Sequence, residues 1–585
     1  MRLAPRSRAA GEMPLDWVLD KVSARNDDVE GEKVEEAIGA RLAALAAALT
    51  SGSIDTRFVE GLVAPGFRAG EVAPRALETV HASGGLVVSR TGRVVAESGA
   101  PWPADDPALP GRSASDLVRG IAELTDGWSR VIKAKFKVFR VEATAPGAAR
   151  ASALLETDGD LRAGGSVQVR AVWHTRWARA GEDWRLVELR PGPLEKATLE
   201  ARAFVEITDA ALGANPSWRE QLLVGLDAWR TRIDSASGID IYGHQGISVG
   251  DADGDGREDL YIAQPAGLPN RLFRSRGDGT FEDITERSDT GVLDTTGGSL
   301  FVDLDGDRDQ DLVVVTALEV LLFENDGRGR FTRRMGTGIE RASDEGASSM
   351  GCAAADHDRD GDLDLYVFAY IFWAGAGSKT HTSYPYPYHD AENGAPNHFF
   401  RNDGGWRFTD ITAASGLDVN NRRFSLAASW CDYDDDGDPD LYVANDFGRN
   451  NLYRNDAGRF RDVAAEAGVE DTGNGMSVAW EDYDGDGRMD LYVGNMWSSA
   501  GNRLVEQPSF RRTAGGLEAV YRRMARGNSL FRNLGGGRFE DVTEASGTAF
   551  GRWAWSCAFL DHDSDGREDL FIANGFVTNE SPGDL

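Results

Sequence analysis

The sequence DYDGDGRMDLYVGN, residues 482–495, places four aspartates and three glycines around a short apolar segment. Numbered from Asp482, the aspartates occupy positions 1, 3, 5 and 9 of the motif, and Gly487 occupies position 6. Carboxylates at such close spacing repel one another unless a cation lies among them. Oxygens at alternating positions of a tight loop suit calcium, and a glycine at position 6 permits the sharp turn. The motif therefore predicts a calcium-binding loop that leads directly into a β-strand.

The same motif occurs six times in the last two thirds of the chain. Successive first aspartates are 52, 53, 76, 50 and 79 residues apart, so the base period is near fifty and two steps carry an insertion. The predicted calcium ligands are the aspartates at positions 1, 3, 5 and 9 of each copy: Asp251, Asp253, Asp255 and Asp259; Asp303, Asp305, Asp307 and Asp311; Asp356, Asp358, Asp360 and Asp364; Asp432, Asp434, Asp436 and Asp440; Asp482, Asp484, Asp486 and Asp490; Asp561, Asp563, Asp565 and Asp569.

The copy at Asp303 departs from the pattern because Arg308 replaces the glycine of position 6. A residue with a side chain is poorly suited to a turn of positive φ, and a cation beside the loop opposes calcium. We therefore expect about five calcium sites, with the site at Asp303 weak or absent. Plain solvated turns do not need aspartate at four fixed positions, so that alternative is disfavoured.

Each motif lies within a longer repeat of four short predicted strands. A run of small and apolar residues precedes the loop, as in GMSVAWE, and DLYV follows it. A third strand such as NLYRN and a fourth such as RFEDVT complete the repeat. Four strands at this period are typical of a β-propeller blade. We predict a mainly β fold, with a six- or seven-bladed β-propeller over residues 204–585.

In these motifs the chain resembles FG-GAP and VCBS repeat proteins, whose repeats form the propellers of integrin α-subunits. It is most similar in pattern to bacterial relatives of cartilage acidic protein. The resemblance covers about residues 200–585 and implies a propeller with calcium in its DxDxDGxxD loops. It is far less specific for activity than for fold.

Closure of the ring is predicted less directly, because the last copy supplies only two strands before Leu585. Residues 204–210, FVEITDA, match the fourth-strand pattern FEDVTEA of residues 539–545 and are expected to complete the last blade. Two alternatives are a degenerate seventh blade from residues 211–245 and a natural chain that continues beyond Leu585.

Two insertions, residues 369–396 and 496–526, fall between the second and third strands of their repeats. Strand alternation then places them on the face opposite the calcium loops. They are rich in Tyr, Trp, Arg, Met and His, which are favoured at binding sites. We interpret them as a ligand face, the alternative being that they only cover the mouth of the channel.

Two classes of function remain open. The first is a binding module for a protein or carbohydrate ligand. The second is an enzyme of lyase or hydrolase type, with a pocket at the insertion face or in the N-terminal domain. The chain has no nucleophile elbow, phosphate loop or HExxH motif, so we assign no catalytic residue. The weak candidates lie together in one insertion: His381, Tyr384, Tyr386, Tyr388 and His389.

The N-terminal third has a different pattern. Residues 1–30 are expected to be disordered, and amphipathic helices are predicted over residues 30–49 and 113–127. Alternating strands follow from Lys133, which indicates an α+β domain over residues 31–190. By pattern alone, this domain resembles the nuclear transport factor 2-like fold. His174 is a candidate pocket residue there, although a strand histidine is more often simply packed. Residues 191–203 are predicted to be a linker.

Composition narrows the partners and the compartment. The formal charge of −32 argues against nucleic acid. No apolar run is long enough for a membrane span, and residues 1–20 contain no apolar segment typical of a signal peptide. We nevertheless expect an extracytoplasmic protein (periplasmic, secreted or on the cell surface), where millimolar calcium fills modest sites.

Two further residue types are predicted to be structural. Cys352, Cys431 and Cys557 are far apart in the sequence and are interpreted as packed thiols. His357 and His562 occupy position 2 of their loops and are predicted to point away from the ion.

Overall fold

The structure is a computed structural model that describes residues 30–96, 102–104, 109–181, 183–201, 204–225, 228–229, 232, 246–339, 347–372, 385–507, 510 and 516–575. The chain forms two compact units. The N-terminal unit comprises residues 1–203 together with residues 498–525, and the propeller-like unit comprises residues 204–497 and 526–583. The predicted disordered segment, residues 1–30, lies outside the described residues except for Glu30.

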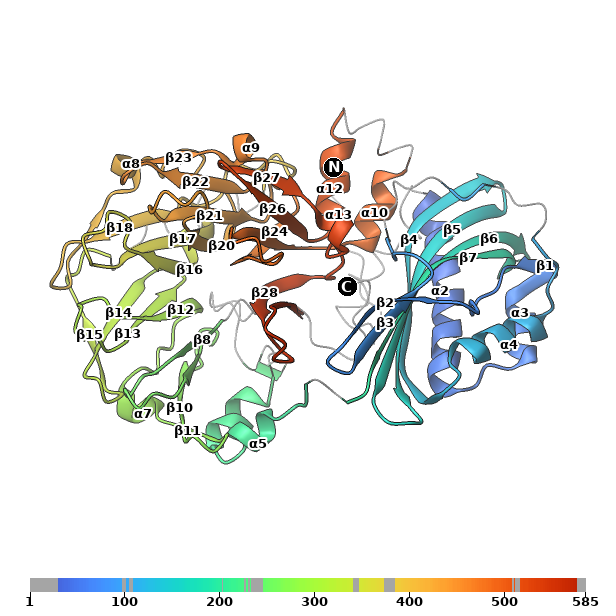
Figure 1. The fold of residues 1–585 in the computed structure, drawn as a ribbon, viewed down its shortest axis with the longest axis horizontal. Coiled ribbons are helices and arrows are strands. Elements are labelled where there is room, and N and C mark those ends of the chain that lie inside the picture. Colours follow the sequence, from blue (N-terminus) through green and yellow to red (C-terminus); the bar gives the residue numbers. More distant parts are fainter. Residues whose placement is uncertain are drawn as a thin grey trace, which may run out of the picture. The chain divides into compact units, whose positions relative to one another are not determined.

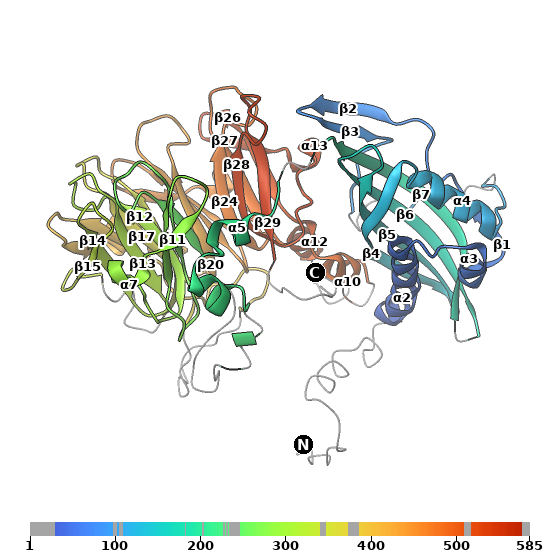
Figure 2. The same cartoon turned by 90° about the horizontal axis from the view of Figure 1, so that it is seen from below.

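The N-terminal unit is built on one sheet whose strands run in the order β2-β3-β7-β6-β5-β4. Strand β1 pairs in parallel with β7, and the long strands β4 to β7 form an antiparallel meander (Figure 2). The strand bounds are β1 Val63–Ala69, β2 Glu78–Ser83, β3 Leu86–Arg90, β4 Trp128–Ala145, β5 Ala148–Leu161, β6 Ser166–Ala180 and β7 Asp183–Leu199.

Helices supply the other half of this unit's core. They are α2 Glu30–Ser51, α3 Thr56–Leu62 and α4 Ala114–Leu124. Val34, Ile38, Leu42 and Leu45 recur at helical spacing on α2 and are buried against the alternating apolar residues of the sheet. A capping box between Ser113 and Asp116 begins α4. The two helices predicted from the sequence therefore correspond to α2 and α4.

The predicted linker is wrong for most of its length. Residues 191–199 belong to β7, which pairs with both β3 and β6. The sequence there contains Pro191 and Pro193, which favour a loop, but long pairing partners on both sides hold the segment in the sheet.

The propeller-like unit is mainly β, with successive antiparallel sheets of four strands. Sheet 1 contains β8 Ile247–Gly250, β9 Asp259–Ile262, β10 Arg271–Ser275 and β11 Phe281–Asp283; sheet 2 contains β12 Thr296–Val302, β13 Asp311–Thr316, β14 Val320–Asn325 and β15 Phe331–Arg334; sheet 3 contains β16 Ala347–Ala355, β17 Asp364–Phe372, β18 His398–Asn402 and β19 Phe408–Asp410. Sheet 4 contains β20 Ser425–Cys431, β21 Asp440–Asn445, β22 Asn451–Asn455 and β23 Phe460–Asp462; sheet 5 contains β24 Gly475–Glu481, β25 Asp490–Asn495, β26 Ser529–Gly535 and β27 Arg538–Asp541; sheet 6 has two described strands, β28 Ala554–Leu560 and β29 Asp569–Asn574.

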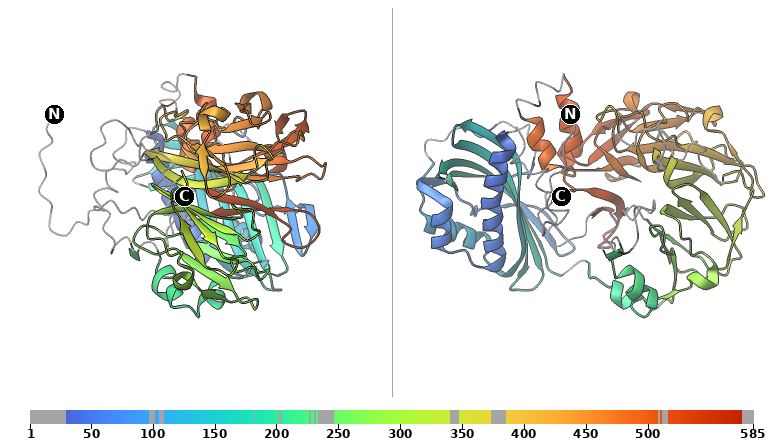
Figure 3. Two further views of the ribbon diagram at one scale, coloured as in Figure 1. Left: turned by 90° about the vertical axis from the view of Figure 1, so that its left-hand side faces the viewer. Right: turned by 180° about the vertical axis from the view of Figure 1, so that it is seen from behind.

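The first strands of neighbouring sheets contact one another in chain order, from β8 through β12, β16, β20 and β24 to β28 (Figures 1 and 3). Apolar clusters fill each space between neighbouring sheets; Val313 and Val315 of sheet 2, for example, pack with Leu365 and Val367 of sheet 3. Short helices follow the fourth strands: α7 Thr285–Ser288, α8 Thr412–Ser415, α9 Ala464–Ala467 and α13 Thr543–Ser546.

The expected closing strand at residues 204–210 is not formed. Thr208–Leu212 is helix α5, and the π-helix η2 Trp218–Leu222 follows it. Leu212 and Trp218 pack against Phe273 of sheet 1, and this apolar contact favours helices over strands here. Phe204 does stack on His562 of the last loop, with ring centroids 6.1 Å apart. The proposed seventh blade is therefore wrong for residues 211–225, and most of residues 226–245 lie outside the described residues.

The second insertion follows β25, the second strand of sheet 5, as the sequence predicted. The first insertion also comes after the second strand of its sheet, but its predicted start is wrong, because residues 369–372 still belong to β17. Of the first insertion, residues 369–372 and 385–396 are described. The second insertion contains α10 Ser499–Val505 and α12 Glu518–Arg526, and its residues 498–525 belong to the N-terminal unit. Among the described helices, none is long and apolar enough to cross a membrane.

Candidate metal centres

Each predicted calcium loop connects the first and second strands of its sheet and is organised by its first aspartate. In the loop at Asp482, the two carboxylate oxygens accept hydrogen bonds from the backbone amides of Asp486, at 2.9 Å, and Gly487, at 2.8 Å. The loops at Asp251, Asp356, Asp432 and Asp561 repeat both bonds at positions 5 and 6. The position 1 carboxylate therefore closes the turn through these backbone hydrogen bonds alone.

The aspartate at position 9 is the first residue of the second strand, and in sheets 1 to 5 it is buried. Asp440 shows the pattern: one carboxylate oxygen accepts from the amide of Tyr433, at 3.3 Å, and the other from the amide of Asn455 on β22, at 2.7 Å. This residue thus ties the loop to the third strand of its own sheet. The sequence predicted position 9 only as a calcium ligand.

The aspartates at position 3 include oxygens that the protein leaves unsatisfied. Among the described residues, the buried Oδ1 atoms of Asp253, Asp434 and Asp563 have no hydrogen-bond partner. A buried carboxylate oxygen without a partner is costly unless a cation or water approaches it. These three atoms fit the donor set that calcium requires.

The pKa values of the loop carboxyls reflect the same crowding. Burial, followed by the charges of Asp436 and Asp432, raises the pKa of Asp434 above its ordinary value. Burial is also the main cause at position 9, where it raises the pKa of Asp311 to about 7 and that of Asp440 to about 8. A cation among these groups would offset the repulsion.

Guanidinium groups already approach some of the carboxylates. Arg567, at position 7 of the last loop, lies 2.6 Å from a carboxylate oxygen of Asp565, at position 5. The loops at Asp251 and Asp482 contain the same pair of positions 7 and 5, as Arg257 with Asp255 and Arg488 with Asp486. In these three loops, a metal ion would share the position 5 carboxylate with an arginine.

The loop at Asp303 keeps the turn despite its different sequence. Arg308 has a φ of 78°, close to the φ of 87° at Gly487 in the equivalent position. The carboxylate of Asp303 accepts from the amides of Gly306, at 2.8 Å, and Arg308, at 3.0 Å. The backbone therefore adopts a left-handed conformation at a residue with a side chain, which is unfavourable.

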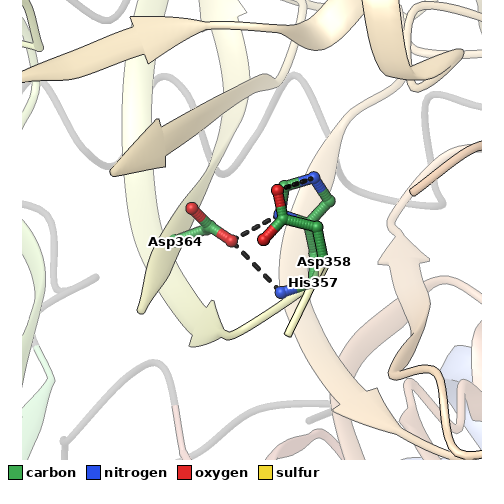
Figure 4. A group of neighbouring side chains, drawn as sticks. All are labelled: His357, Asp358 and Asp364. Carbon is green, nitrogen blue, oxygen red and sulfur yellow. Dashed lines mark hydrogen bonds and ion pairs between the residues drawn. The ribbon is translucent and has the colours of Figure 1, made fainter. Parts of the chain in front are cut away.

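The two histidines at position 2 do not point away from the loops, and that prediction is wrong. Nδ1 of His357 contacts the carboxylate of Asp364, and its Nε2 lies 4.0 Å from an oxygen of Asp358 (Figure 4). His562 contacts Asp569 in the same way. The imidazole of His357 is drawn inward because the buried carboxylate of Asp364 accepts its N–H. Although burial opposes it, this hydrogen bond raises the pKa of His357.

Several predicted ligands come close enough to share one ion. Their potential ligand atoms lie within 4.8 Å of one another in the following groups: Asp251, Asp253 and Asp255; Asp303, Asp305 and Asp311; Asp356, Asp358 and Asp360; His357, Asp358 and Asp364; His562, Asp563 and Asp569. Sequence reasoning had not placed the histidines in such groups.

The three cysteines pack in the clusters between sheets, Cys352 with sheet 2, Cys431 with sheet 5 and Cys557 with Tyr492. Burial raises the pKa of the Cys352 thiol to about 12, so this thiol stays protonated.

The described part of the first insertion is anchored by ion pairs. Arg423 is only 2 % exposed in its side chain and lies 2.7 Å from Asp390, which also pairs with Arg449 at 2.9 Å. Next to this anchor, Tyr386 is 79 % exposed. Tyr388 packs against Phe447, with ring centroids 5.1 Å apart. His389 is also described, whereas His381 and Tyr384 lie outside the described residues.

In the N-terminal unit, His174 lies at a small cavity of about 20 Å³ beside Trp102 and Arg190. Its Nδ1 lies 2.9 Å from Ser152 Oγ. Burial, with the charges of Arg140 and Arg190, lowers the pKa of His174 to about 4, so the ring is neutral at pH 7. A larger cavity of about 410 Å³ lies between the end of α2, α4 and the start of β4.

Sequence reasoning missed a set of asparagines at or near the end of the third strands: Asn325, Asn402, Asn455 and Asn533. All four are buried. Their recurrence at one position of the repeat was the available signal, as in NLYRN and SLFRN.

A family model described as the FG-GAP-like repeat matches residues 251–314, 303–367, 432–493 and 515–572. The chain contains FG-GAP-like repeats. Repeats of this family are typical of ligand-binding modules. Comparison with curated proteins gave no match.

The similarity of this chain to solved structures is weaker. A lectin of Agrocybe aegerita that recognises non-reducing terminal N-acetylglucosamine is 15 % identical, with a TM-score of 0.33, over 56 % of this chain and 73 % of the lectin. A putative scytalone dehydratase from Novosphingobium aromaticivorans is 6 % identical, with a TM-score of 0.19, over 29 % of this chain and 94 % of that protein. A hexachlorocyclohexane dehydrochlorinase is 7 % identical, with a TM-score of 0.18, over 28 % of this chain and 85 % of the enzyme. TM-scores this low carry no argument about fold or function.

Proposed function

We propose that the chain is a calcium-stabilised β-propeller that serves as an extracytoplasmic binding module for a protein or carbohydrate ligand. The observation that carries the calcium assignment is the unsatisfied, buried carboxylate oxygen at position 3 of three loops. Bound calcium supplies positive charge to carboxylates that otherwise repel one another. Positions 1, 3 and 5 would hold the ion, while position 9 fixes the loop to the sheet.

The number of sites follows from the loops. Five loops have glycine at position 6 and the same pair of hydrogen bonds from position 1. The loop at Asp303 would bind more weakly because Arg308 adds a positive charge and a strained backbone. Extracellular modules bind calcium in the range of about 0.1–1 mM, which favours a compartment outside the cytoplasm.

The ligand face is proposed at the first insertion. Tyr386 is an exposed aromatic side chain on a segment that Asp390 fixes to Arg423 and Arg449. Exposed aromatic residues on a rigid base are typical of binding hot spots. The second insertion is less suited to this role, since Ser499, Arg503 and other residues of α10 are buried within the N-terminal unit.

Binding of the full chain to glycan and protein arrays, with calcium and with a chelator, tests this proposal. We expect a ligand whose signal requires calcium and falls at least tenfold in Tyr386→Ala. Met335→Ala is the matched control, because Met335 is also an exposed apolar residue, 66 % exposed, outside the insertion. Equal signals from the two variants would refute the assignment of the face.

A further inference from the structure

The buried asparagines of the third strands connect neighbouring loops. Asn455 of sheet 4 donates one hydrogen bond from Nδ2 to the carbonyl of Pro439, at 3.2 Å, in its own loop. It donates another to the carbonyl of His357, at 2.9 Å, in the loop of sheet 3. A single amide group therefore holds position 8 of one loop and position 2 of the preceding loop.

The same two bonds occur at three other junctions. Asn325 donates to the carbonyls of Gln310, at 2.9 Å, and Ala252, at 2.9 Å. Asn402 donates to those of Leu363, at 3.4 Å, and Leu304, at 2.8 Å, and Asn533 to those of Met489, at 3.1 Å, and Tyr433, at 2.8 Å. In each case the more distant carbonyl along the chain belongs to position 2 of the preceding loop.

These bonds join the position 9 aspartates into one continuous chain of contacts. The amide of Asn455 donates to Asp440, and its side chain reaches the carbonyl of His357. The amide of His357 donates in turn to Asp364, at 3.1 Å. Repeated at each junction, this route runs from Asp490 to Asp259 through the following residues: Asn533, Tyr433, Asp440, Asn455, His357, Asp364, Asn402, Leu304, Asp311, Asn325 and Ala252.

We propose that the four asparagines are positioning residues that couple each metal loop to the preceding one, so that successive loops bind calcium cooperatively. This inference rests on the proposed function, because it requires that the loops bind calcium. Coupling is expected because position 2 of each loop lies between the proposed ligands at positions 1 and 3. Fixing its carbonyl from the next sheet and its amide from position 9 restricts both neighbouring carboxylates.

The coupling between two neighbouring loops is reciprocal, and the route ends at sheet 1. An ion that orders the loop at Asp432 would favour the conformation in which Asn455 holds position 2 of the loop at Asp356, and this reduces the ordering cost there. In sheet 1, Ser275 occupies the position of the asparagines. Its amide still donates to Asp259, at 2.7 Å, but serine has no amide group to reach a preceding loop. The loop at Asp303 lies within the route and would transmit coupling even if it binds weakly.

Calcium titration of the full chain, followed by calorimetry, tests the proposal. The wild type is expected to bind with a Hill coefficient above one. Asn455→Ser introduces the residue that sheet 1 uses, and it should weaken binding at two loops by about 5- to 150-fold, the usual range of coupling. Asn325→Ser repeats the test at another junction if Asn455→Ser does not fold.

Asn450→Ser is the matched control. Asn450 is equally buried at the other end of the third-strand region of the same sheet, where it contacts Tyr442 and Asn445 and not a metal loop. This variant is expected to lose stability and keep the cooperative binding curve. No calcium binding by the wild type would refute the proposed function. Calcium binding with a wild-type Hill coefficient of one, or a binding curve unchanged in a folded Asn455→Ser protein, would refute the coupling alone.

Discussion

The two units of this protein hold their folds in opposite ways. In the propeller-like unit, each loop closes on itself through bonds that span four or five residues, such as those from Asp482 to Asp486 and Gly487. In the N-terminal unit, the side chain of Arg503 from α10 lies 3.1 Å from Glu32 on α2, although 471 residues separate them. One unit repeats a local pattern, and the other includes a segment from a distant part of the chain.

This difference decides what stabilises each unit. A repeated acidic loop concentrates like charge, which arginines such as Arg567 offset in part and which calcium, on the proposed function, would offset further. Arg503 instead supplies a cation from within the chain: it is only 5 % exposed, pairs with Glu32 and Glu35, and donates to the carbonyl of Val138, at 2.6 Å. We expect the stability of the propeller-like unit to respond to calcium. We expect the stability of the N-terminal unit to respond to substitutions in α10.

The largest expected effect is that of chelation. At a hundredfold excess over its dissociation constant, calcium would stabilise the folded state by about 2.7 kcal/mol per site, or about 14 kcal/mol if five sites contributed additively. A chelator should therefore lower the melting temperature of the propeller-like unit by far more than that of the N-terminal unit. Calorimetry with and without chelator measures both transitions.

Elemental analysis of the protein dialysed to equilibrium against a known calcium concentration well above 1 mM provides the control for this prediction, with about five calcium ions per chain expected in excess of the buffer. A melting profile that is indifferent to chelator, together with a protein that contains no calcium, would contradict the metal assignment.

Next in size is the effect of Arg503→Ala. Removal of one partner from a fully buried ion pair costs about 3–5 kcal/mol, and this is an upper bound here because the remaining carboxylates are only partly buried, Glu32 at 13 % and Glu35 at 21 % exposed. The N-terminal unit should lose up to this amount in its free energy of unfolding, whereas the transition of the propeller-like unit should change little. Denaturant unfolding with a probe in each unit makes the comparison.

Arg119→Ala is the control in the same unit, since Arg119 is 64 % exposed and pairs with Asp116 at the surface. Such pairs contribute about 0–1 kcal/mol. Equal losses in the two variants would show that α10 is not a structural part of the N-terminal unit.

The sequence predicted the repetitive unit well because its information is local. The position of each loop, the strand that begins at each position 9 and the placement of the insertions all follow from one motif. The pattern failed at residues 204–210, where alternating apolar residues match a strand but Leu212 packs as a helix against Phe273 of sheet 1. It also failed for α10, because nothing near residue 503 indicates that Glu32 will be its partner. Contacts of this kind depend on the folded arrangement and leave no local signal.

The smallest expected effects are the differences in stability between variants of two loops within the propeller-like unit. Asp486→Ala removes a proposed calcium ligand from a loop with glycine at position 6, and should cost up to about 2.7 kcal/mol when calcium is present at a hundredfold excess. Asp307→Ala makes the same change in the loop with Arg308 and should cost less, because that site is expected to be largely unfilled. Melting temperatures of the two variants at one calcium concentration give the comparison.

Arg308→Gly tests the same difference between the two loops by placing glycine at position 6 of the loop at Asp303, which should strengthen that site. Arg308 has a φ of 78°, and a left-handed conformation costs an L-residue roughly 1–2 kcal/mol, a cost that glycine avoids. Glycine also makes the unfolded chain more flexible, by roughly 0.5–1 kcal/mol, so the net gain without calcium should be small. With calcium present, the variant should gain further, since the loop then has the sequence pattern of the other five and loses a nearby positive charge. A stability that does not rise with calcium more than in the wild type would show that the residue at position 6 does not control the site.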